Sequence, residues 1–166
     1  MTVLELGGRY GTVSCVINNK LENPRNHVVL EPDKTVINAL IKNRKTHKSK
    51  FVIINGIISL KPMKISKNGY ASTVLKANVG DTDLVYTISL KDIMKKFNLN
   101  FNCLVADCEG CLCDFLTENG EYIKNYKMII FEADQPKICN YNEVIQKLKL
   151  WGFKNVVNAF ISVWKK

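Results

Sequence analysis

The sequence predicts a single α/β domain built around a mostly parallel β-sheet. Short apolar runs of strand length alternate along the chain with segments whose apolar residues recur at helical spacing. The chain has 166 residues, which is enough for one domain with a sizeable core. Its 46% hydrophobic and 23% charged residues are typical of an ordinary globular protein. No apolar run approaches the roughly 20 residues that a membrane-spanning helix needs, so no membrane partner is expected.

Five apolar runs predict parallel strands, at residues 3–6, 27–31, 51–54, 102–106 and 127–132. Segments with helical spacing predict helices at residues 12–21, 33–41, 90–97, 112–116 and 141–150, the second of them capped by Asp33. Residues 57–89 contain short alternating runs broken by glycine turns at 67–69 and 79–81, which indicates a β-hairpin insertion within one domain, 1–166. Two last runs, 153–157 and 160–164, are close enough to pair as an antiparallel hairpin.

Acidic residues lie at the ends of four of the predicted strands. They occur in the segments 5–7, 31–32, 107–110 and 132–134. In a doubly wound sheet, ligands bind beyond the carboxyl ends of the strands, near the point where the strand order reverses. Because buried carboxylates are costly unless each has a partner, these acids indicate a polar ligand at that edge of the sheet.

The segment from Glu5 to Gly11 is the most informative local pattern. Gly7 allows a tight turn, Gly7 and Gly8 allow a close approach of the backbone, and Gly11 can admit the following helix close to the strand. The loop is longer than a dinucleotide-binding loop, and an acid precedes it. This suits a ligand with an ammonium group and no phosphate, such as the methionine part of S-adenosylmethionine. Glu31 closes the second strand, where an acid can accept both hydroxyls of a ribose.

Seven segments of the chain agree in their order with one known family: 3–12, 30–33, 40–43, 87–93, 107–110, 129–132 and 152–153. Over these segments, which extend across nearly the full length, the sequence resembles the FkbM family of S-adenosylmethionine-dependent methyltransferases. The Asp-x-Glu-Gly element at 107–110 is the most family-specific of them. The resemblance implies a three-layer Rossmann-like methyltransferase sandwich, with a mostly parallel seven-stranded sheet and an antiparallel last strand.

The resemblance also implies a cofactor and an activity. S-adenosyl-L-methionine would lie with its methionine end along the glycine loop, its ribose at Glu31, its adenine beside residues 55–57 and its methyl group near Asp107. The cofactor-binding residues expected on this basis are Glu5, Gly7, Gly8, Arg9, Tyr10, Gly11, Glu31, Pro32, Asn55, Gly56, Ile57 and Asp107. Family members mostly methylate oxygen, often in sugars or glycosylated natural products. The expected acceptor is therefore a carbohydrate or another small molecule with a hydroxyl group.

Three carboxylates are the catalytic candidates. Methyl transfer to a hydroxyl needs close positioning of the reactants, and a base when the acceptor is a poor nucleophile. Asp107 or Glu109 is the candidate group that orients or deprotonates the acceptor, while Glu132 shapes the pocket together with Asp134. The alternative is that Asp107 only binds the amino group of the cofactor and that Glu109 caps the following helix.

Three positions depart from the family pattern. Arg9 replaces a small polar residue, Val105 replaces a common lysine, and Leu112 replaces a frequent glutamate. These departures affect catalysis more than cofactor binding, so a catalytically silent Rossmann-like binding or scaffold domain is one alternative. An RNA methyltransferase is another, suggested by the net charge of +9, although the lysines are spread along the whole chain. The RNA hypothesis predicts strongly salt-dependent RNA binding.

Six cysteines in a chain with a good apolar core favour reduced thiols in a cytosol-like compartment, and hence a cytoplasmic location. The N-terminus has no basic segment followed by a long apolar stretch, so no signal peptide is expected. No metal site is expected, because Cys103 lies in a predicted strand while Cys111 and Cys113 face different ways on a predicted helix. His27 and His47 are isolated and are expected at the surface.

Overall fold

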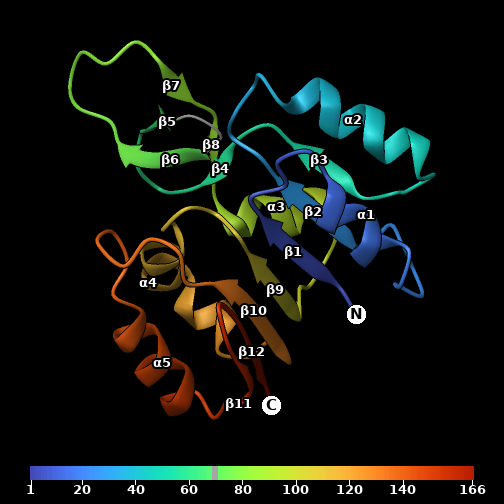
Figure 1. Cartoon of the computed structure of the whole chain (residues 1–166), viewed down its shortest axis with the longest axis vertical. Coiled ribbons are helices and arrows are strands. Elements are labelled where there is room, and N and C mark those ends of the chain that lie inside the picture. Colours follow the sequence, from blue (N-terminus) through green and yellow to red (C-terminus); the bar gives the residue numbers. More distant parts are fainter. Residues whose placement is uncertain (69–70) are drawn as a thin grey trace.

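A seven-stranded sheet forms the centre of the computed structural model, which describes residues 1–68 and 71–166 (Figure 1). Its strands are, in chain order, β1 (Val3–Leu6), β2 (His27–Leu30), β3 (Val52–Ile54), β9 (Cys103–Ala106), β10 (Met128–Glu132), β11 (Lys154–Asn158) and β12 (Ile161–Lys165). Their spatial order is β11-β12-β10-β9-β1-β2-β3. The pairs from β3 to β10 are all parallel, whereas β12 is antiparallel to both β10 and β11. The predicted fold class, including the antiparallel last strand, is confirmed.

Helices cover both faces of this sheet. They are α1 (Thr12–Asn18), α2 (Ile37–Thr46), α3 (Leu90–Phe97), α4 (Leu112–Ile123) and α5 (Tyr141–Leu150). Successive side chains of a strand point to opposite faces, so each of the parallel strands β1, β2, β3, β9 and β10 contributes to two apolar clusters. One cluster contains residues of α3, α4 and α5, and the other two contain residues of α1 and α2. The molecule therefore has three layers, with the sheet in the middle.

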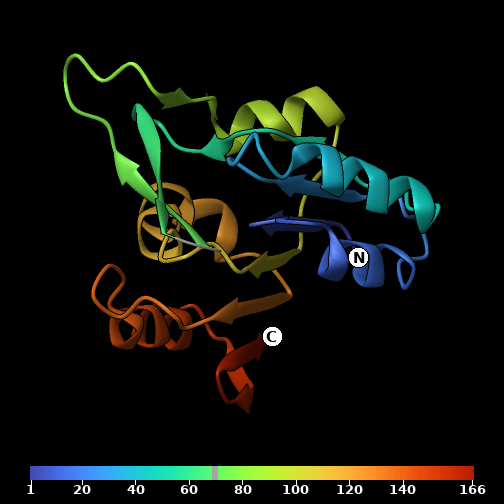
Figure 2. The ribbon, with the colours of Figure 1, turned by 45° about the horizontal axis from the view of Figure 1, so that its top comes forward.

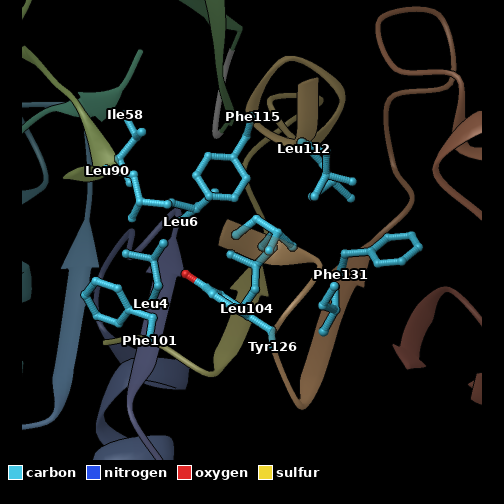
Figure 3. Close-up of a cluster of buried hydrophobic side chains, with 14 of the residues drawn as sticks. Leu4, Leu6, Ile58, Leu90, Phe101, Leu104, Leu112, Phe115, Tyr126 and Phe131 are labelled. Carbon is cyan, nitrogen blue, oxygen red and sulfur yellow. The ribbon is translucent and has the colours of Figure 1, made fainter. Parts of the chain in front are cut away.

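The larger cluster is the main hydrophobic core. Figure 3 shows side chains of β1, β9 and β10 together with Leu112 and Phe115 of α4. β1 and β9 are buried along their whole length, which explains why apolar residues predominate in both. No helix among the described residues is long and apolar enough to cross a membrane.

The expected insertion at 57–89 contains five short strands: β4 (Ile57–Ile58), β5 (Met63–Asn68), β6 (Ala71–Lys76), β7 (Leu84–Val85) and β8 (Thr87–Ile88). β4 pairs in parallel with β8, while β5 pairs antiparallel with β6 and with β7. Figures 1 and 2 show the β5–β6 hairpin projecting from the sheet near α4, and the Lys76 ammonium lies 3.7 Å from the Asp114 carboxylate of that helix. The expected turn at 67–69 lies partly outside the described residues.

Two predicted helices differ at their ends. The first helix stops at Asn18 instead of continuing to residue 21. The second begins at Ile37, so the prediction that Asp33 caps it is wrong. The Asp33 carboxylate instead accepts hydrogen bonds from the backbone N–H of Thr35 at 2.9 Å and from the Thr35 hydroxyl at 2.6 Å. Asp33 thus stabilises a turn before the helix.

His27 lies in the interior, contrary to the expectation of a surface position. Its side chain is completely buried at the start of β2, and its Nε2 atom lies 2.8 Å from the Glu5 carboxylate. The Ser14 hydroxyl donates to the other Glu5 oxygen at 2.7 Å. Burial follows from the position of β2 between β1 and β3, with Phe51 packed against the imidazole. His47 is exposed beyond the end of α2, as expected.

Four of the six cysteines form disulfides, so the expectation of reduced thiols is wrong for them. The bridges join Cys108 to Cys111 and Cys113 to Cys139, whereas Cys15 and Cys103 are free and buried. The second bridge connects α4 to the loop before α5, a proximity that spacing along one helix does not reveal. The cytosol-like compartment inferred from reduced cysteines loses this support.

The Cys113–Cys139 bridge is expected to stabilise the fold measurably. It closes a loop with a sequence separation of 26, and removing such a crosslink increases the entropy of the unfolded chain. We expect the double variant Cys113→Ser/Cys139→Ser to lose about 3 kcal/mol of unfolding free energy in urea titrations. An unchanged free energy of unfolding, with four reactive thiols already present in the unmodified protein, would contradict this bridge.

Candidate functional site

A cavity of about 240 Å³ opens at the carboxyl edge of the sheet. Its walls come from the loop after β1, the end of β2, the loop between β9 and α4, and the insertion with the adjoining face of α4, while one further residue comes from the loop between β10 and α5. The lining segments are 6–10, 12–13, 30–32, 56–59 and 107–111, with Met63, Ser72, Val74, Asp114, Phe115, Glu118 and Ile138. The cavity therefore lies where β1 separates β2 from β9, which is the point at which the strand order reverses.

The glycine loop turns sharply at Gly7. The backbone N–H groups of Gly7 and Gly8 both donate to the Leu30 carbonyl at 3.0 Å, and Gly7 has a φ of 88°. A Cβ atom at position 7 would overlap the Asp107 carbonyl oxygen, so only glycine fits there. The other end of the loop differs from the prediction in one respect, because Gly11 makes room for Leu40 of α2.

Glu31 is held by two backbone donors. The N–H of Arg9 donates to one of its carboxylate oxygens and the N–H of Asp33 to the other, both at 2.7 Å. Burial raises the pKa of the Glu31 carboxyl, and the two backbone hydrogen bonds counteract this effect. Each oxygen keeps a second lone pair, so the carboxylate can still accept two hydroxyl groups from a ligand in the cavity. Pro32 follows it in the cavity wall.

Asp33 anchors cations beside this wall. The Arg9 guanidinium lies 3.5 Å from its carboxylate and the Lys67 ammonium 3.2 Å. Burial raises the pKa of Asp33, but hydrogen bonds from Thr35, Lys67 and Ser72 outweigh burial and lower the pKa to about 2. Asp33 therefore remains ionised, which keeps the Arg9 guanidinium beside it.

The remaining predicted cofactor residues divide into two groups. Arg9, Tyr10, Gly56 and Ile57 line the cavity, as do Gly7, Gly8, Glu31, Pro32 and Asp107, whereas Gly11 does not. Asn55 is exposed and donates to the Glu31 carbonyl at 2.8 Å, so it supports the end of β2 without lining the cavity.

The structure does not bring the Glu5 carboxylate to the cavity either. Both of its oxygens are occupied, one by the Ser14 hydroxyl and one by His27, and the residue is 2% exposed. Its side chain points to the face of the sheet covered by α1, away from the predicted methionine position. The acid that precedes the glycine loop thus links β1 to α1 and to β2.

Four carboxylates gather beyond the ends of β9 and β10. Asp107 and Glu109 line the cavity, while Glu132 and Asp134 lie behind them. The Gln135 amide donates to Glu109 at 2.7 Å. Burial raises the pKa of Glu109, and the neighbouring Asp134 and Asp107 charges raise it further. Glu109 has a left-handed φ of 51° and makes no cap, because the N-cap of α4 is Cys111 and no side chain caps it.

Glu132 is the most strongly perturbed of the four. Burial, contact with Asp107 and the charges of Asp134 and Glu109 raise its pKa to about 7. Near neutral pH, Glu132 therefore exists partly in its protonated form. Such a carboxyl can donate a hydrogen bond as well as accept one. Among residues 1–68 and 71–166, no group of histidine, cysteine and acidic side chains is arranged to hold a metal ion.

Sequence reasoning missed the side chains that close the cavity from the insertion and from α4. Met63, Ser72 and Val74 come from the β5–β6 hairpin, and Phe115 comes from α4. Nothing in their local pattern separates them from ordinary core or strand residues. The sequence also offered no sign that Cys108 and Cys111 line the same cavity.

Comparison with known proteins defines the fold. No protein-family model and no curated protein matched the sequence, but solved structures did. Precorrin-6y C5,15-methyltransferase from Geobacter metallireducens superposes with a TM-score of 0.59 at 13% identity, covering 99% of this chain and 79% of that chain. An O-methyltransferase from Bacillus cereus in complex with SAH superposes with a TM-score of 0.51 at 12% identity, and the match covers 99% of this chain and 73% of that chain.

A provisionally assigned tRNA (m1A22) methyltransferase from Streptococcus pneumoniae, in complex with S-adenosyl-L-methionine, gives a TM-score of 0.56 at 12% identity. The match covers 99% of this chain but only 65% of that one, so this chain spans less than two thirds of its length. At these identities the similarity shows the fold alone. The chain therefore has the Rossmann-like fold of S-adenosylmethionine-dependent methyltransferases.

The raised pKa of Glu132 makes stability depend on pH. Between the ordinary carboxyl pKa of 4.5 and the folded value of about 7, the folded state binds more protons than the unfolded state. We therefore expect the free energy of unfolding to fall as the pH rises through this window. In urea titrations at a series of pH values within this window, the free energy of unfolding should fall with pH more steeply for the unmodified protein than for Glu132→Gln. The exposed Glu143→Gln is the control and should behave like the unmodified protein. Parallel pH profiles for all three proteins would contradict the shift.

Proposed function

We propose that the chain is an S-adenosylmethionine-dependent methyltransferase that binds its cofactor in the cavity at the carboxyl edge of the sheet. The observation that carries this proposal is the Glu31 carboxylate in the cavity wall. Two backbone N–H groups hold it in place, and each of its oxygens can accept one more hydrogen bond. A carboxylate at the end of the second strand suits the two hydroxyls of a ribose. Ile57 and Met63 offer apolar surface for a purine nearby.

The charge of the cavity supports the same ligand. A methionine sulfonium group and an ammonium group are both cationic, and Asp107 and Glu109 present carboxylates from the loop next to the glycine loop. Arg9 is the one cation in the described lining, and it lies beside Asp33. A dinucleotide would instead place a pyrophosphate here, at the start of an α1 helix of only seven residues. The acidic wall disfavours such an anion.

The bound cofactor would supply an electrophilic methyl group. The acceptor hydroxyl would then need to lie in line with that group, and a base near it would take up the proton. Glu109 is suited to this role, because its raised pKa makes its carboxylate a stronger base than an ordinary glutamate. Asp107 would orient the acceptor or the ammonium group, and Glu132 would hold Asp107 in place from behind.

A hydroxyl of a sugar or glycan is the acceptor class we propose. Such a group is neutral, so the acidic cavity does not repel it. An RNA acceptor was suggested by the net charge of +9, but most cations lie at the opposite, amino edge of the sheet. These are Lys20, Arg25, Lys42, Arg44, Lys45, Lys48, Lys50, Lys95, Lys96, Lys124, Lys127, Lys147, Lys149, Lys154, Lys165 and Lys166.

Backbone hydrogen bonds join neighbouring segments at this amino edge. The backbone N–H of Lys127 donates to the Asn102 carbonyl at 2.8 Å, and the backbone N–H of Lys166 donates to the Lys127 carbonyl at 3.1 Å. A phosphate backbone attracted to this edge would lie at the far ends of the strands from Asp107. The charge of the chain therefore does not favour RNA as the acceptor over a glycan.

Titration calorimetry with S-adenosylhomocysteine and with S-adenosylmethionine tests the cofactor. We expect micromolar, one-to-one binding that Glu31→Gln weakens by about tenfold to a hundredfold, because hydrogen bonds to a charged group are lost. Glu22→Gln, an exposed acid in the loop after α1, is the matched control and should bind normally. Absence of binding to a well-folded sample would refute the proposed function.

Single substitutions distinguish an active enzyme from a silent binding domain. In assays with glycan acceptors, we expect Glu109→Gln to lower turnover by about a hundredfold or more while cofactor affinity stays within a few-fold, because a general base contributes mainly to the chemical step. Asp107→Asn should lower both turnover and cofactor affinity. Cofactor binding without turnover on glycan, protein and RNA acceptors would favour the silent domain instead.

A further inference from the structure

We propose that Cys108 and Cys111 form a redox-active pair, a site of thiol–disulfide exchange in the cavity wall that reacts with dithiol reductants. We infer further that reduction of this bridge changes the affinity of the cavity for its adenosyl ligand. This second statement rests on the proposed function, whereas the first does not.

The position of the bridge makes it accessible. Cys108 and Cys111 both line the cavity and are half-buried, and they lie in the loop that follows β9, one and four residues after Asp107. Cys111 is also the N-cap residue of α4, a helix of 12 residues. The partial positive charge at a helix N-terminus stabilises a thiolate, and a Cys-x-x-Cys spacing at such a position is typical of exchangeable pairs.

The second bridge lies next to the first but differs from it in its access from the cavity. Cys139 is completely buried and Cys113 is half-buried, and neither of them lines the cavity. A reductant that reaches Cys108 from the cavity therefore has no comparable path to Cys139 in the folded protein. The two bridges therefore differ in their access from the cavity, which provides an internal control.

The exposed bridge encloses an unusual backbone segment. Glu109 has a φ of 51° and Gly110 a φ of 91°, so two successive residues are left-handed. The N–H of Cys111 donates to the Cys108 carbonyl at 3.2 Å and closes the turn. A left-handed conformation is unfavourable for glutamate, and the bridge restrains the residues on either side of it. Opening the bridge allows Glu109 to return to a negative φ, which moves its carboxylate away from Gln135.

The chemistry of opening is a two-electron exchange. A thiolate of the dithiol forms a bond to the sulfur of Cys108, the bond between the two protein sulfurs breaks, and Cys111 leaves as a thiolate that takes up a proton. Cys111 is the better leaving group because it lies at the helix N-terminus. The second thiol of the reductant then displaces Cys108. The protein gains two thiols, and the reductant becomes a cyclic disulfide.

The first arm of the test measures exchange in the folded protein. The full chain is equilibrated in mixtures of reduced and oxidised dithiothreitol, free thiols are alkylated, and labelled cysteines are identified by mass spectrometry. We expect Cys108 and Cys111 to be labelled under native conditions in which Cys113 and Cys139 remain bonded. Labelling of all four only on unfolding, or free thiols at 108 and 111 after oxidation, would overturn the proposal.

The second arm measures S-adenosylhomocysteine affinity in the oxidised and the selectively reduced protein. We expect the dissociation constant to change at least about threefold, since the carboxylate of Glu109 faces the ligand. Cys108→Ser/Cys111→Ser should match the reduced protein and no longer respond to reductant. Cys113→Ser/Cys139→Ser should still respond. Equal affinity in both redox states would overturn the coupling, while absence of binding in either state would refute the proposed function and leave the labelling result to decide the exchange site.

Discussion

The close approach of the Asp107 carbonyl group to Gly7 is the constraint on which the rest of the site depends. β1 lies between β2 and β9, so the loops that follow these strands must pass close to one another. A glycine at position 7 allows the first loop to turn directly beneath the start of the loop between β9 and α4. The N–H of Arg9 can then reach Glu31, and the two loops together line one cavity.

The direction of the strands also separates the charges of the molecule. Parallel strands with helical connections place helix N-termini at the carboxyl edge of the sheet and helix C-termini at the amino edge. Acids near helix N-termini and lysines near helix C-termini both complement the helix dipoles. Asp92 and Lys95 of α3 illustrate the two ends. An acidic cavity thus exists in a chain of net charge +9, and the overall charge is a poor guide to the ligand.

The loop between β9 and α4 concentrates the chemistry of the site. Within five residues it carries the Asp107 and Glu109 carboxylates and a disulfide that spans Glu109. The environment of Glu109 depends on neighbours from the end of β10, because Asp134 raises its pKa and Gln135 hydrogen-bonds to it. A change in this loop therefore reaches the cavity directly, which links the proposed base and the proposed redox site to one short segment.

The sequence by itself determined the order and type of the main elements. The central strands, such as β1 and β9, were predicted closely because strands that are buried on both faces consist mainly of apolar residues. The glycine loop, Glu31 and the carboxylates after β9 could also be predicted, since turns and strand ends have local signatures. Only the tertiary structure decided that Glu5 pairs with His27 and that the β5–β6 hairpin closes the cavity. It also decided the cysteine pairing. The physical reason is that residue spacing reports burial along one element, whereas contacts between distant segments depend on how the layers pack.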